Sequence, residues 1–186
     1  MLTIDLKPYA NLETERLVLR LIQDSDAERL LQLRSDPAVM QFIDRAHMQK
    51  LKEANELIQK IKVDWITDSG ITWAITQKPD DAMIGSIGFW RIDKENHRAE
   101  IGYMMLPEYQ GQGLMREAIT RVLETGFRHI GFHSVEANIN PHNDRSRRLL
   151  ESVGFVQEAY FRENYFYDGR YFDSAIFSLI DPGKAQ

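Results

Sequence analysis

The sequence contains no cysteine among its 186 residues. Disulfides, cysteine-ligated zinc and a thiol nucleophile are therefore excluded. Long apolar runs are also missing: no stretch approaches the ~20 residues of a membrane-spanning helix, so we expect no membrane association. Basic residues number 23 and acidic ones 28, which gives a net charge of −5. Nucleic-acid-binding surfaces are usually basic, and we expect none here.

Histidine is scarce too, and its placement does not predict a metal site. His129 and His133 are four residues apart, but Gly131 interrupts the helix that would bring them to one face. The N-terminus lacks the charged-then-apolar order of a signal peptide, which predicts a cytoplasmic protein. No linker or low-complexity run divides the chain, so residues 1–186 are expected to form a single domain.

Apolar periodicity predicts alternating strands and helices after an initial run of strands. Three antiparallel strands followed by alternating helix and strand are typical of an α+β fold with a mixed sheet. The expected strands cover residues 12–21, 71–76, 83–92, 98–106, 134–138, 156–167 and 171–180, and the expected helices begin near residues 25, 49, 115 and 144. Gly85 and Gly88 inside one strand predict a bulge or a closely approaching ligand.

A strand, a glycine loop and a helix follow one another over residues 100–130. Pro107 ends the strand, Gln110–Gly113 forms the loop, and the helical pattern starts at Met115. Backbone N–H groups of such a loop and the first helical turn converge on one point, where the helix dipole favours an anion. The loop has neither the Lys-Ser/Thr of a P-loop nor a GxGxxG fingerprint. A phosphate site and a plain strand-to-helix turn both fit these residues.

The outer face of this helix offers two ion pairs at i,i+4 spacing, Glu117–Arg121 and Glu124–Arg128. A second strand, turn and helix follow over residues 134–155. Asn143 or Asp144 is a natural N-cap there, and Gly154 stands where a C′ glycine belongs.

Together these two segments resemble the GNAT family of acetyl-CoA-dependent N-acetyltransferases. The family's Gln/Arg-x-x-Gly-x-Gly/Ala loop is matched by Gln110, Gly113 and, imperfectly, Met115; its Asn-x-x-Ser … Gly-Phe element is matched by Asn143, Ser146, Gly154 and Phe155. The opening at Thr14–Arg20 and the ending at Asp168–Asp173 are similar to the RimJ/RimL-type branch. The resemblance implies a mixed, mostly antiparallel sheet of about seven strands with flanking helices.

The resemblance also implies a site for acetyl-CoA as co-substrate, without a metal. The pyrophosphate would lie on the glycine loop, and the pantetheine arm between strands 98–106 and 134–138. The implied cofactor-binding residues are Met104, Met105, Leu106, Gln110, Gly111, Gln112, Gly113, Leu114, Met115, Asn138, Asn143 and Ser146. For Asn143, capping the helix that follows is an equally good role.

Acetyl transfer needs a base for the amine and an acid for the leaving thiolate. Glu100 matches the position where many family members place the base, although a surface carboxylate paired with Arg98 fits the same residue. Many members carry a tyrosine acid where this chain has Leu150. Leucine cannot donate a proton, so Ser146, Tyr103 or a water would have to act instead.

The acceptor is left open by the sequence. A protein N-terminal amine, ribosomal-protein-like, is the first expectation, and a small-molecule amine such as an aminoglycoside or polyamine is the second. A non-catalytic acyl-CoA-binding sensor and a ligand-free interaction domain are the alternatives from other classes. Phe42, Trp65 and the aromatic hairpin 160–172 are candidates for the acceptor cleft, and the chain is expected to be a monomer or a homodimer.

Overall fold

The computed structural model describes residues 2–183. Its centre is a sheet of eight strands in the order β1-β2-β3-β4-β5-β6-β8-β7. The strands are β1 (Asn11–Glu13), β2 (Leu17–Leu21), β3 (Ile71–Gln77), β4 (Met83–Asp93), β5 (Arg98–Met105), β6 (Ser134–Ile139), β7 (Val156–Tyr167) and β8 (Arg170–Ile180). The α-helices are α1 (Ala27–Ser35), α2 (Pro37–Met40), α3 (Leu51–Ile66), α4 (Leu114–Thr125) and α5 (Asp144–Ser152).

Only β5 and β6 are parallel, and every other neighbouring pair in the sheet is antiparallel. The expected mixed, mostly antiparallel α+β fold is confirmed. The sheet has eight strands instead of about seven because residues 12–21 form a hairpin. Thr14 Oγ1 accepts from the backbone N–H of Leu17 at 2.9 Å and closes the turn between β1 and β2. The polar run at residues 13–16 is the sequence signal for this turn, and the expectation of a single strand passed over it.

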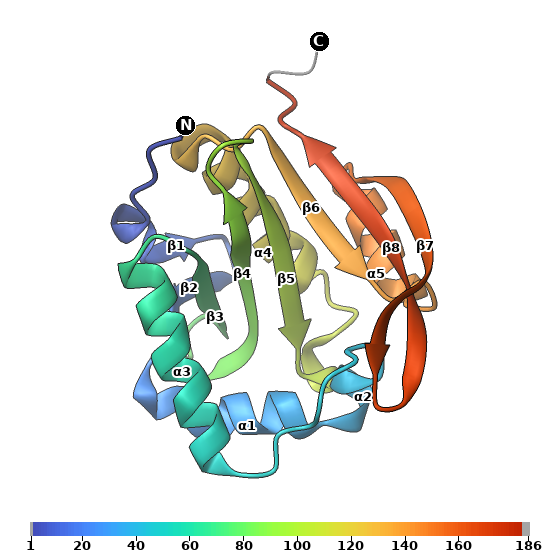
Figure 1. Ribbon diagram of the computed structural model, residues 1–186. Helices are drawn as coiled ribbons and strands as arrows, with labels where there is room; N and C mark the ends of the chain where they lie inside the picture. Colours follow the sequence, from blue (N-terminus) through green and yellow to red (C-terminus); the bar gives the residue numbers. More distant parts are fainter. Residues whose placement is uncertain (1, 184–186) are drawn as a thin grey trace.

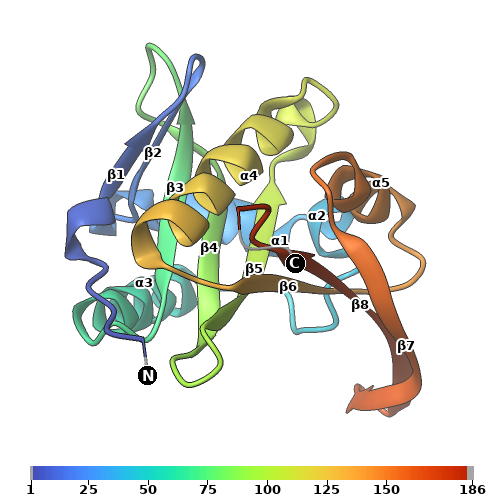
Figure 2. The same ribbon diagram turned by 90° about the horizontal axis from the view of Figure 1, so that it is seen from above.

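Helices cover both faces of the sheet (Figures 1 and 2). On one face α4 packs on β strands through Leu114, Ile119 and Val122, all buried in the larger apolar cluster. On the other face α1 and α3 bury Leu30, Leu33 and Ile58 in a second cluster. The glycine loop of the candidate site leads into α4 on the first face, and Glu100 and Trp90 lie on the second.

The glycines of β4 are needed for contact with neighbouring strands. A Cβ on Gly88 would lie 2.2 Å from the carbonyl oxygen of Ile71, and one on Gly85 would lie 2.5 Å from that of Met104. The sheet is also irregular beside Gly85, where the register shifts between Ile75 and Thr76. A bulge was one of the two expectations for these glycines, and it is present. The other was a closely approaching ligand; the atoms that approach the two glycines most closely are backbone atoms of the neighbouring strands.

Candidate active site

The strands β5 and β6 are paired over only three residues each before they separate. Arg98–Glu100 pairs with Ser134–Glu136, after which β6 stays bonded to β8 alone and β5 to β4 alone (Figure 1). From Ile101 to Met105 the β6-facing edge of β5 is therefore without a strand partner. An extended chain that carries amides can bond to such an edge as an added strand would.

The glycine loop joins the end of β5 to α4. Gly111 and Gly113 have φ angles of +77° and +78°, a conformation that favours glycine. Within residues 2–183, the backbone N–H groups from Gly111 to Arg116 have no hydrogen-bond partner. Unpaired donors at the N-terminal end of a helix are the groups that bind anions in proteins, because the helix dipole also favours negative charge there.

Gln110 holds the loop against β5 instead of pointing away from the protein. Its side-chain Nε2 donates to the carbonyl oxygen of Met105 at 2.7 Å, and its Oε1 accepts from Arg145 of α5. The predicted cofactor residue Gln110 is thus a connector between both sides of the gap. Met104 packs toward the α1 face, and Leu106 is buried there.

A second brace reaches the loop from the N-terminal hairpin. Arg16 bonds to Glu117 of α4 at 2.7 Å and donates to the carbonyl oxygen of Gln112 at 3.0 Å. Thr14 also donates to Glu117. The expected Glu117–Arg121 pair is therefore wrong, because Arg121 pairs with Glu124 instead; the expected Glu124–Arg128 pair is present at 3.3 Å.

Hydroxyl groups bridge the gap from β5 to α5. The Tyr103 hydroxyl and Ser146 Oγ lie 2.7 Å apart, and Ser146 is buried. Burial raises the pKa of the Tyr103 hydroxyl to about 12, so it stays protonated at neutral pH. Leu150, at the position of the family's tyrosine, is fully buried in the core. The Tyr103–Ser146 pair therefore places two hydroxyl groups, both possible proton donors, at this gap.

Asn143 caps α5, as one of its two expected roles requires. Its Oδ1 accepts from the backbone N–H of Ser146 at 3.0 Å. Gly154 takes a φ of +97° after the helix, as expected for a C′ glycine. Asn138, in contrast, is exposed on β6 and alternates with the buried Val135 and Ala137, so its side chain lies on the face opposite α4.

Glu100 lies at the last paired position of β5, where the two strands begin to separate. It is 8% exposed and bonds to Arg91 Nη1 at 2.9 Å. Burial raises the pKa of the Glu100 carboxyl above its ordinary value, and the Arg91 guanidinium partly offsets this. The expected alternative, a surface carboxylate paired with Arg98, is wrong, because Arg98 pairs with Glu136 and Asp93.

Three residues near Glu100 were not found by the sequence analysis. A register shift in β4 lies between Trp90 and Asp93, and Arg91 within it has a φ of +46°. Such irregularities redirect side chains, and here Arg91 reaches Glu100 on the adjacent strand. Arg91 and Arg45 both lie over the Trp90 ring, 5.1 and 5.2 Å from its centroid. No periodicity predicts this cluster, because Arg45 and Trp90 are 45 residues apart in sequence.

The Trp90 side chain lies beside Gly102 of β5. A Cβ on Gly102 would lie 3.8 Å from Trp90 Nε1, and Trp90 is 36% exposed. Trp90 is directly opposite Glu100 in the sheet register. Trp90 and the two arginines on its ring are therefore neighbours of Glu100.

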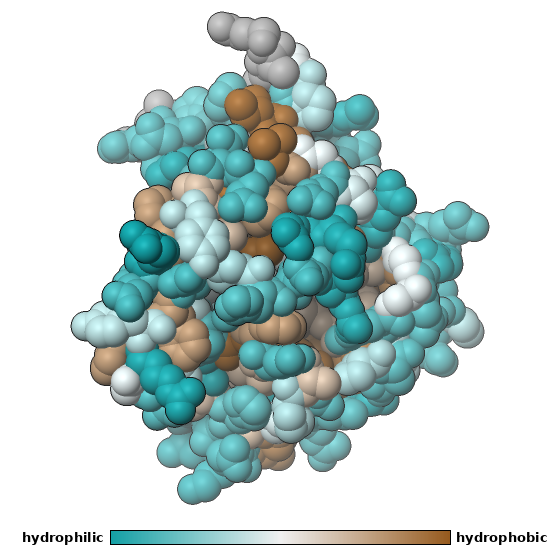
Figure 3. Space-filling view, turned by 90° about the vertical axis from the view of Figure 1, so that its right-hand side faces the viewer, coloured by the Kyte–Doolittle hydropathy of each residue, from teal (hydrophilic) through white to brown (hydrophobic). Residues whose placement is uncertain are grey.

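A cavity of about 510 Å³ lies on this side, between the segment after α1 and the β7–β8 hairpin. It is lined by parts of residues 37–47, Arg45 among them, and by Tyr167, Asp168, Arg170 and Phe172. The Tyr165 hydroxyl donates to Asp44 and joins the two walls. The surface on the hairpin side is mainly hydrophilic, with apolar groups visible between charged ones (Figure 3).

The other candidates for the acceptor cleft lie differently. Trp65 donates from Nε1 to the carbonyl oxygen of Leu6 at 3.3 Å, so it packs against the N-terminal segment and not in the cavity. Phe42 is half-buried and does not line the cavity, although Gln41 and Ile43 do. Of the hairpin, the part near its tip contributes to the lining.

No group of three or more His, Cys, Asp or Glu side chains within residues 2–183 is placed to hold a metal ion. No helix in that range has the length and apolar character needed to cross a membrane.

Known proteins resemble the chain along most of its length. Residues 16–156 match the family model of the acetyltransferase (GNAT) domain. The uncharacterized N-acetyltransferase YoaA of Bacillus subtilis is 33% identical, with 92% of this chain and 97% of that protein aligned. The [ribosomal protein uS5]-alanine N-acetyltransferase of Escherichia coli is 29% identical, over 94% and 93%. The spermidine N(1)-acetyltransferase of Vibrio cholerae is 26% identical, over 85% and 89%.

Solved structures share the fold. The ribosomal-protein-S5-alanine acetyltransferase of Vibrio fischeri superposes with a TM-score of 0.83 at 22% identity, covering 95% of this chain and 99% of that one. At this identity the likeness shows the fold alone.

Proposed function

The chain belongs to the GNAT family of acetyltransferases, which use acetyl-CoA as donor, and from this premise we propose that it acetylates a primary amine with Glu100 as the base. The observation that carries the proposal is the position of Glu100. It is a buried carboxylate at the point where β5 and β6 separate. A base at this point is next to the β6-facing edge of β5. That edge has no strand partner from Ile101 to Met105 and could accept an extended donor molecule.

The free backbone groups support a donor site in this gap. The β6-facing edge of β5 would bind the amides of the pantetheine arm, and the N–H groups from Gly111 to Arg116 would bind the pyrophosphate. Gln110 and Arg16 would keep the loop in place through Met105 and Gln112. Asn143 would act mainly through its cap, by fixing the position of Ser146.

The reaction needs two proton transfers. Acetyl-CoA, when bound, supplies a thioester whose carbonyl carbon forms a bond to the amine nitrogen while its thiolate leaves. Glu100 would take the proton that the attacking amine loses, directly or through a water. Ser146, with its hydrogen bond to the Tyr103 hydroxyl, would give the proton that the thiolate gains. A backbone N–H near Met104 would stabilise the negative charge on the carbonyl oxygen.

We propose an N-terminal α-amine as the acceptor, as in the relative that acetylates the alanine of ribosomal protein uS5. An α-amino group has a pKa near ~8 and is partly neutral at neutral pH, whereas a lysine amine at ~10.4 is almost fully protonated. A small-molecule amine is the second candidate, and its support is the spermidine-acetylating relative. Acetyl-CoA is a cytoplasmic metabolite, so we propose that the protein acts in the cytoplasm.

The test is release of free thiol from acetyl-CoA in the presence of N-terminal peptides and of small amines. We expect acceptor-dependent release by the wild type, and a fall of about 100-fold or more for Glu100→Gln. Acetyl-CoA affinity should stay unchanged in that variant, because Glu100 bonds to Arg91 and not to the residues proposed to bind acetyl-CoA. Glu95→Gln, an exposed acid in the turn before β5, is the matched control and should keep full activity.

The result also separates the enzyme from the sensor alternative. Acetyl-CoA binding without turnover on any amine would favour the sensor. Full activity of Glu100→Gln would refute its role as the base while leaving the transferase in place.

A further inference from the structure

Among the described residues, Arg34 is a half-buried arginine whose Nε lacks a hydrogen-bond partner. It lies near the end of α1, where its side-chain Nε is enclosed by protein and makes no hydrogen bond or ion pair. Buried arginines are normally paired, because an isolated charge loses its hydration without compensation. Its surroundings lower the pKa of Arg34 to about 10, first through burial and then through repulsion by Arg45.

Arg45 continues this positive region toward Glu100. Its guanidinium lies 5.2 Å from the centre of the Trp90 ring and also lines the cavity. Within residues 2–183 the Arg45 side chain has no carboxylate in ion-pair contact. Arg45 is thus close enough to act electrostatically on both Glu100 and Arg34.

The carboxylates close by are already bound to other groups. Asp36 accepts from the backbone N–H groups of Ala38 and Val39 at 2.8 and 3.0 Å and caps α2. Asp44 accepts from the Tyr165 hydroxyl, and Glu100 from Arg91. Asp168 and Arg170 both line the cavity near the hairpin tip. Within residues 2–183 neither Arg34 nor Arg45 is in ion-pair contact with any of these carboxylates.

We propose that the acceptor carries a carboxylate close to the amine that is acetylated, and that Arg45, with Arg34 behind it, binds this carboxylate. The inference rests on the proposed function, because it places the amine at Glu100. Arg45 and Arg91 share one indole ring, and Arg91 bonds directly to Glu100. The carboxylate would thus lie near the same indole as the amine.

A carboxylate at this distance has two sources. It can be the α-carboxylate of a free amino acid, or the side chain of an acidic residue near the N-terminus of a peptide. The cavity of about 510 Å³ has room for either. A polyamine would bring its second positive charge toward Arg45 and Arg170, and would have to bind Asp44 or Asp168 to offset that repulsion.

The experiment compares acceptors that differ in one charge. Alanine is paired with alaninamide, and the peptide Ala-Asp-Ala-amide with Ala-Asn-Ala-amide; spermidine serves as the cationic acceptor. We expect kcat/KM of the wild type to be at least about tenfold higher for the carboxylate member of one pair, as a charge-assisted hydrogen bond would give. The pair that responds identifies the source of the carboxylate.

The variants test which residue binds the carboxylate of the acceptor. Arg45→Gln should bring the ratio within that pair close to one, and Arg45→Lys should restore part of it. Arg29→Gln is the matched control, because Arg29 is half-buried on α1 and, within residues 2–183, its side chain bonds to Gln32 alone; it should keep the wild-type ratio. Equal use of both members by the wild type, or a ratio that survives in Arg45→Gln, would overturn the proposal while leaving acetyl transfer established.

A binding measurement decides the matter without turnover. The N-acetylated forms of the four compounds cannot react, and their affinities can be measured calorimetrically with CoA present. We expect the carboxylate form of one pair to bind about tenfold more tightly, and this difference to be lost in Arg45→Gln. If no amine is acetylated but this difference is found, the proposed reaction fails and the carboxylate site stands. No difference between charged and neutral forms refutes the site.

Discussion

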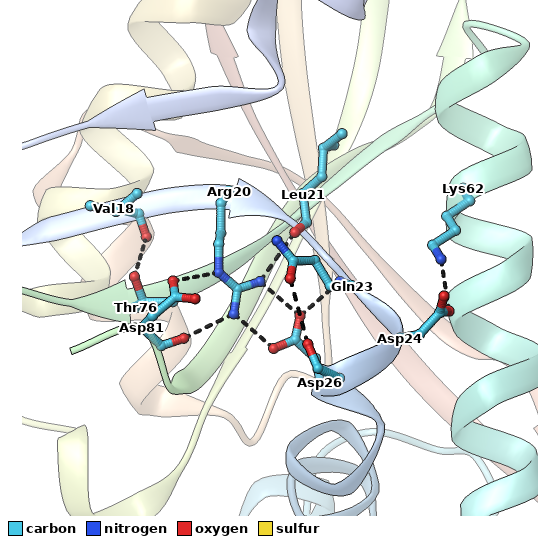
Figure 4. A network of polar contacts seen from close by, with 10 residues as sticks. Val18, Arg20, Leu21, Gln23, Asp24, Asp26, Lys62, Thr76 and Asp81 are labelled. Carbon is cyan, nitrogen blue, oxygen red and sulfur yellow. Dashed lines mark hydrogen bonds and ion pairs between the residues drawn. The ribbon is translucent and has the colours of Figure 1, made fainter.

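Arg20 and Arg34 lie at the two ends of the same short region, just before α1 and near its end, and their surroundings are opposite. Arg20 bonds to both oxygens of Asp26 at 2.8 Å and to Asp81 at 2.7 Å, and it also reaches the carbonyl oxygens of Leu21 and Asp81 (Figure 4). These bonds raise its pKa, the one to Asp26 most. Arg34 has no such partner, and burial lowers its pKa to about 10.

The difference distinguishes a structural arginine from a binding one. A buried charge whose donors are all used holds β2, the start of α1 and the β3–β4 turn together. A buried charge without partners costs stability in the free protein, and a ligand anion can remove that cost. The carboxylate site proposed above is the consequence for Arg34 and Arg45.

The largest effect is expected from breaking the Arg20 network. Asp26→Asn keeps the size of the side chain but removes the charge, which leaves Arg20 buried with half of its compensation. We expect the free energy of unfolding to fall by about 3 kcal/mol, as for other broken buried pairs. Urea titration measures it.

The control is Asp24→Asn, two residues away and also visible in Figure 4. Asp24 pairs with Lys62 at 2.7 Å but is exposed, so the unfolding midpoint should hardly move. If the free energy of unfolding fell equally in both variants, the buried Arg20 network would contribute no more to stability than the exposed Asp24–Lys62 pair.

The Tyr103–Ser146 pair gives the next largest expected effect. The two hydroxyls are hydrogen-bonded to each other, which fits a structural role, but they lie at the gap between β5 and β6, which fits a catalytic one. If the pair acts only as structure, Ser146→Ala should lower stability and leave turnover alone. We expect instead that kcat falls by about 100-fold while acetyl-CoA affinity is kept, because the leaving thiolate loses its acid. Tyr103→Phe removes only the supporting hydroxyl and should cost less. Steady-state kinetics with a donor titration would decide between these outcomes.

Arg34→Met gives a smaller effect of opposite sign to Asp26→Asn. Methionine keeps the length of the side chain and removes a charge without partners, so stability should rise by about 1 kcal/mol. Acceptor preference for a carboxylate should weaken in the same variant. A loss of stability as large as that of Asp26→Asn would mean that Arg34 has a structural role like that of Arg20.

The smallest effect concerns pH. Glu100 must be deprotonated to act as a base, so kcat/KM should fall on the acidic side as the pH approaches its pKa. Arg91 lowers that pKa against the raising effect of burial. In Arg91→Gln the pKa of Glu100 rises, and the acidic limb of kcat/KM should move to higher pH. Arg98→Gln should move it less, because Arg98 bonds to Glu136 and Asp93; equal shifts would contradict the observed pairing.

The sequence by itself determined the features whose causes are local. The glycine loop and the start of α4, the Asn143 cap and the turn at Asp168-Gly169 all follow from residues within a few positions of one another. The family motif also lies in such segments, and the order of the main helices and strands could therefore be predicted. The hairpin of β1 and β2 and the short helix α2 escaped: the polar residues 13–16, which form the hairpin turn, were placed inside one strand, and Pro37 was expected only to end α1.

The tertiary structure decided the partners of the charged side chains. Glu100 pairs with Arg91, Glu117 with Arg16 and Arg20 with Asp81, and Arg45 approaches Trp90 across 45 residues of sequence. Any of 23 basic side chains is a possible partner for a carboxylate in the sequence. Strand register, the shift in β4 and the burial of α1 select one, because charge–charge and hydrogen-bond energies depend on distances of a few ångströms that only the folded chain sets.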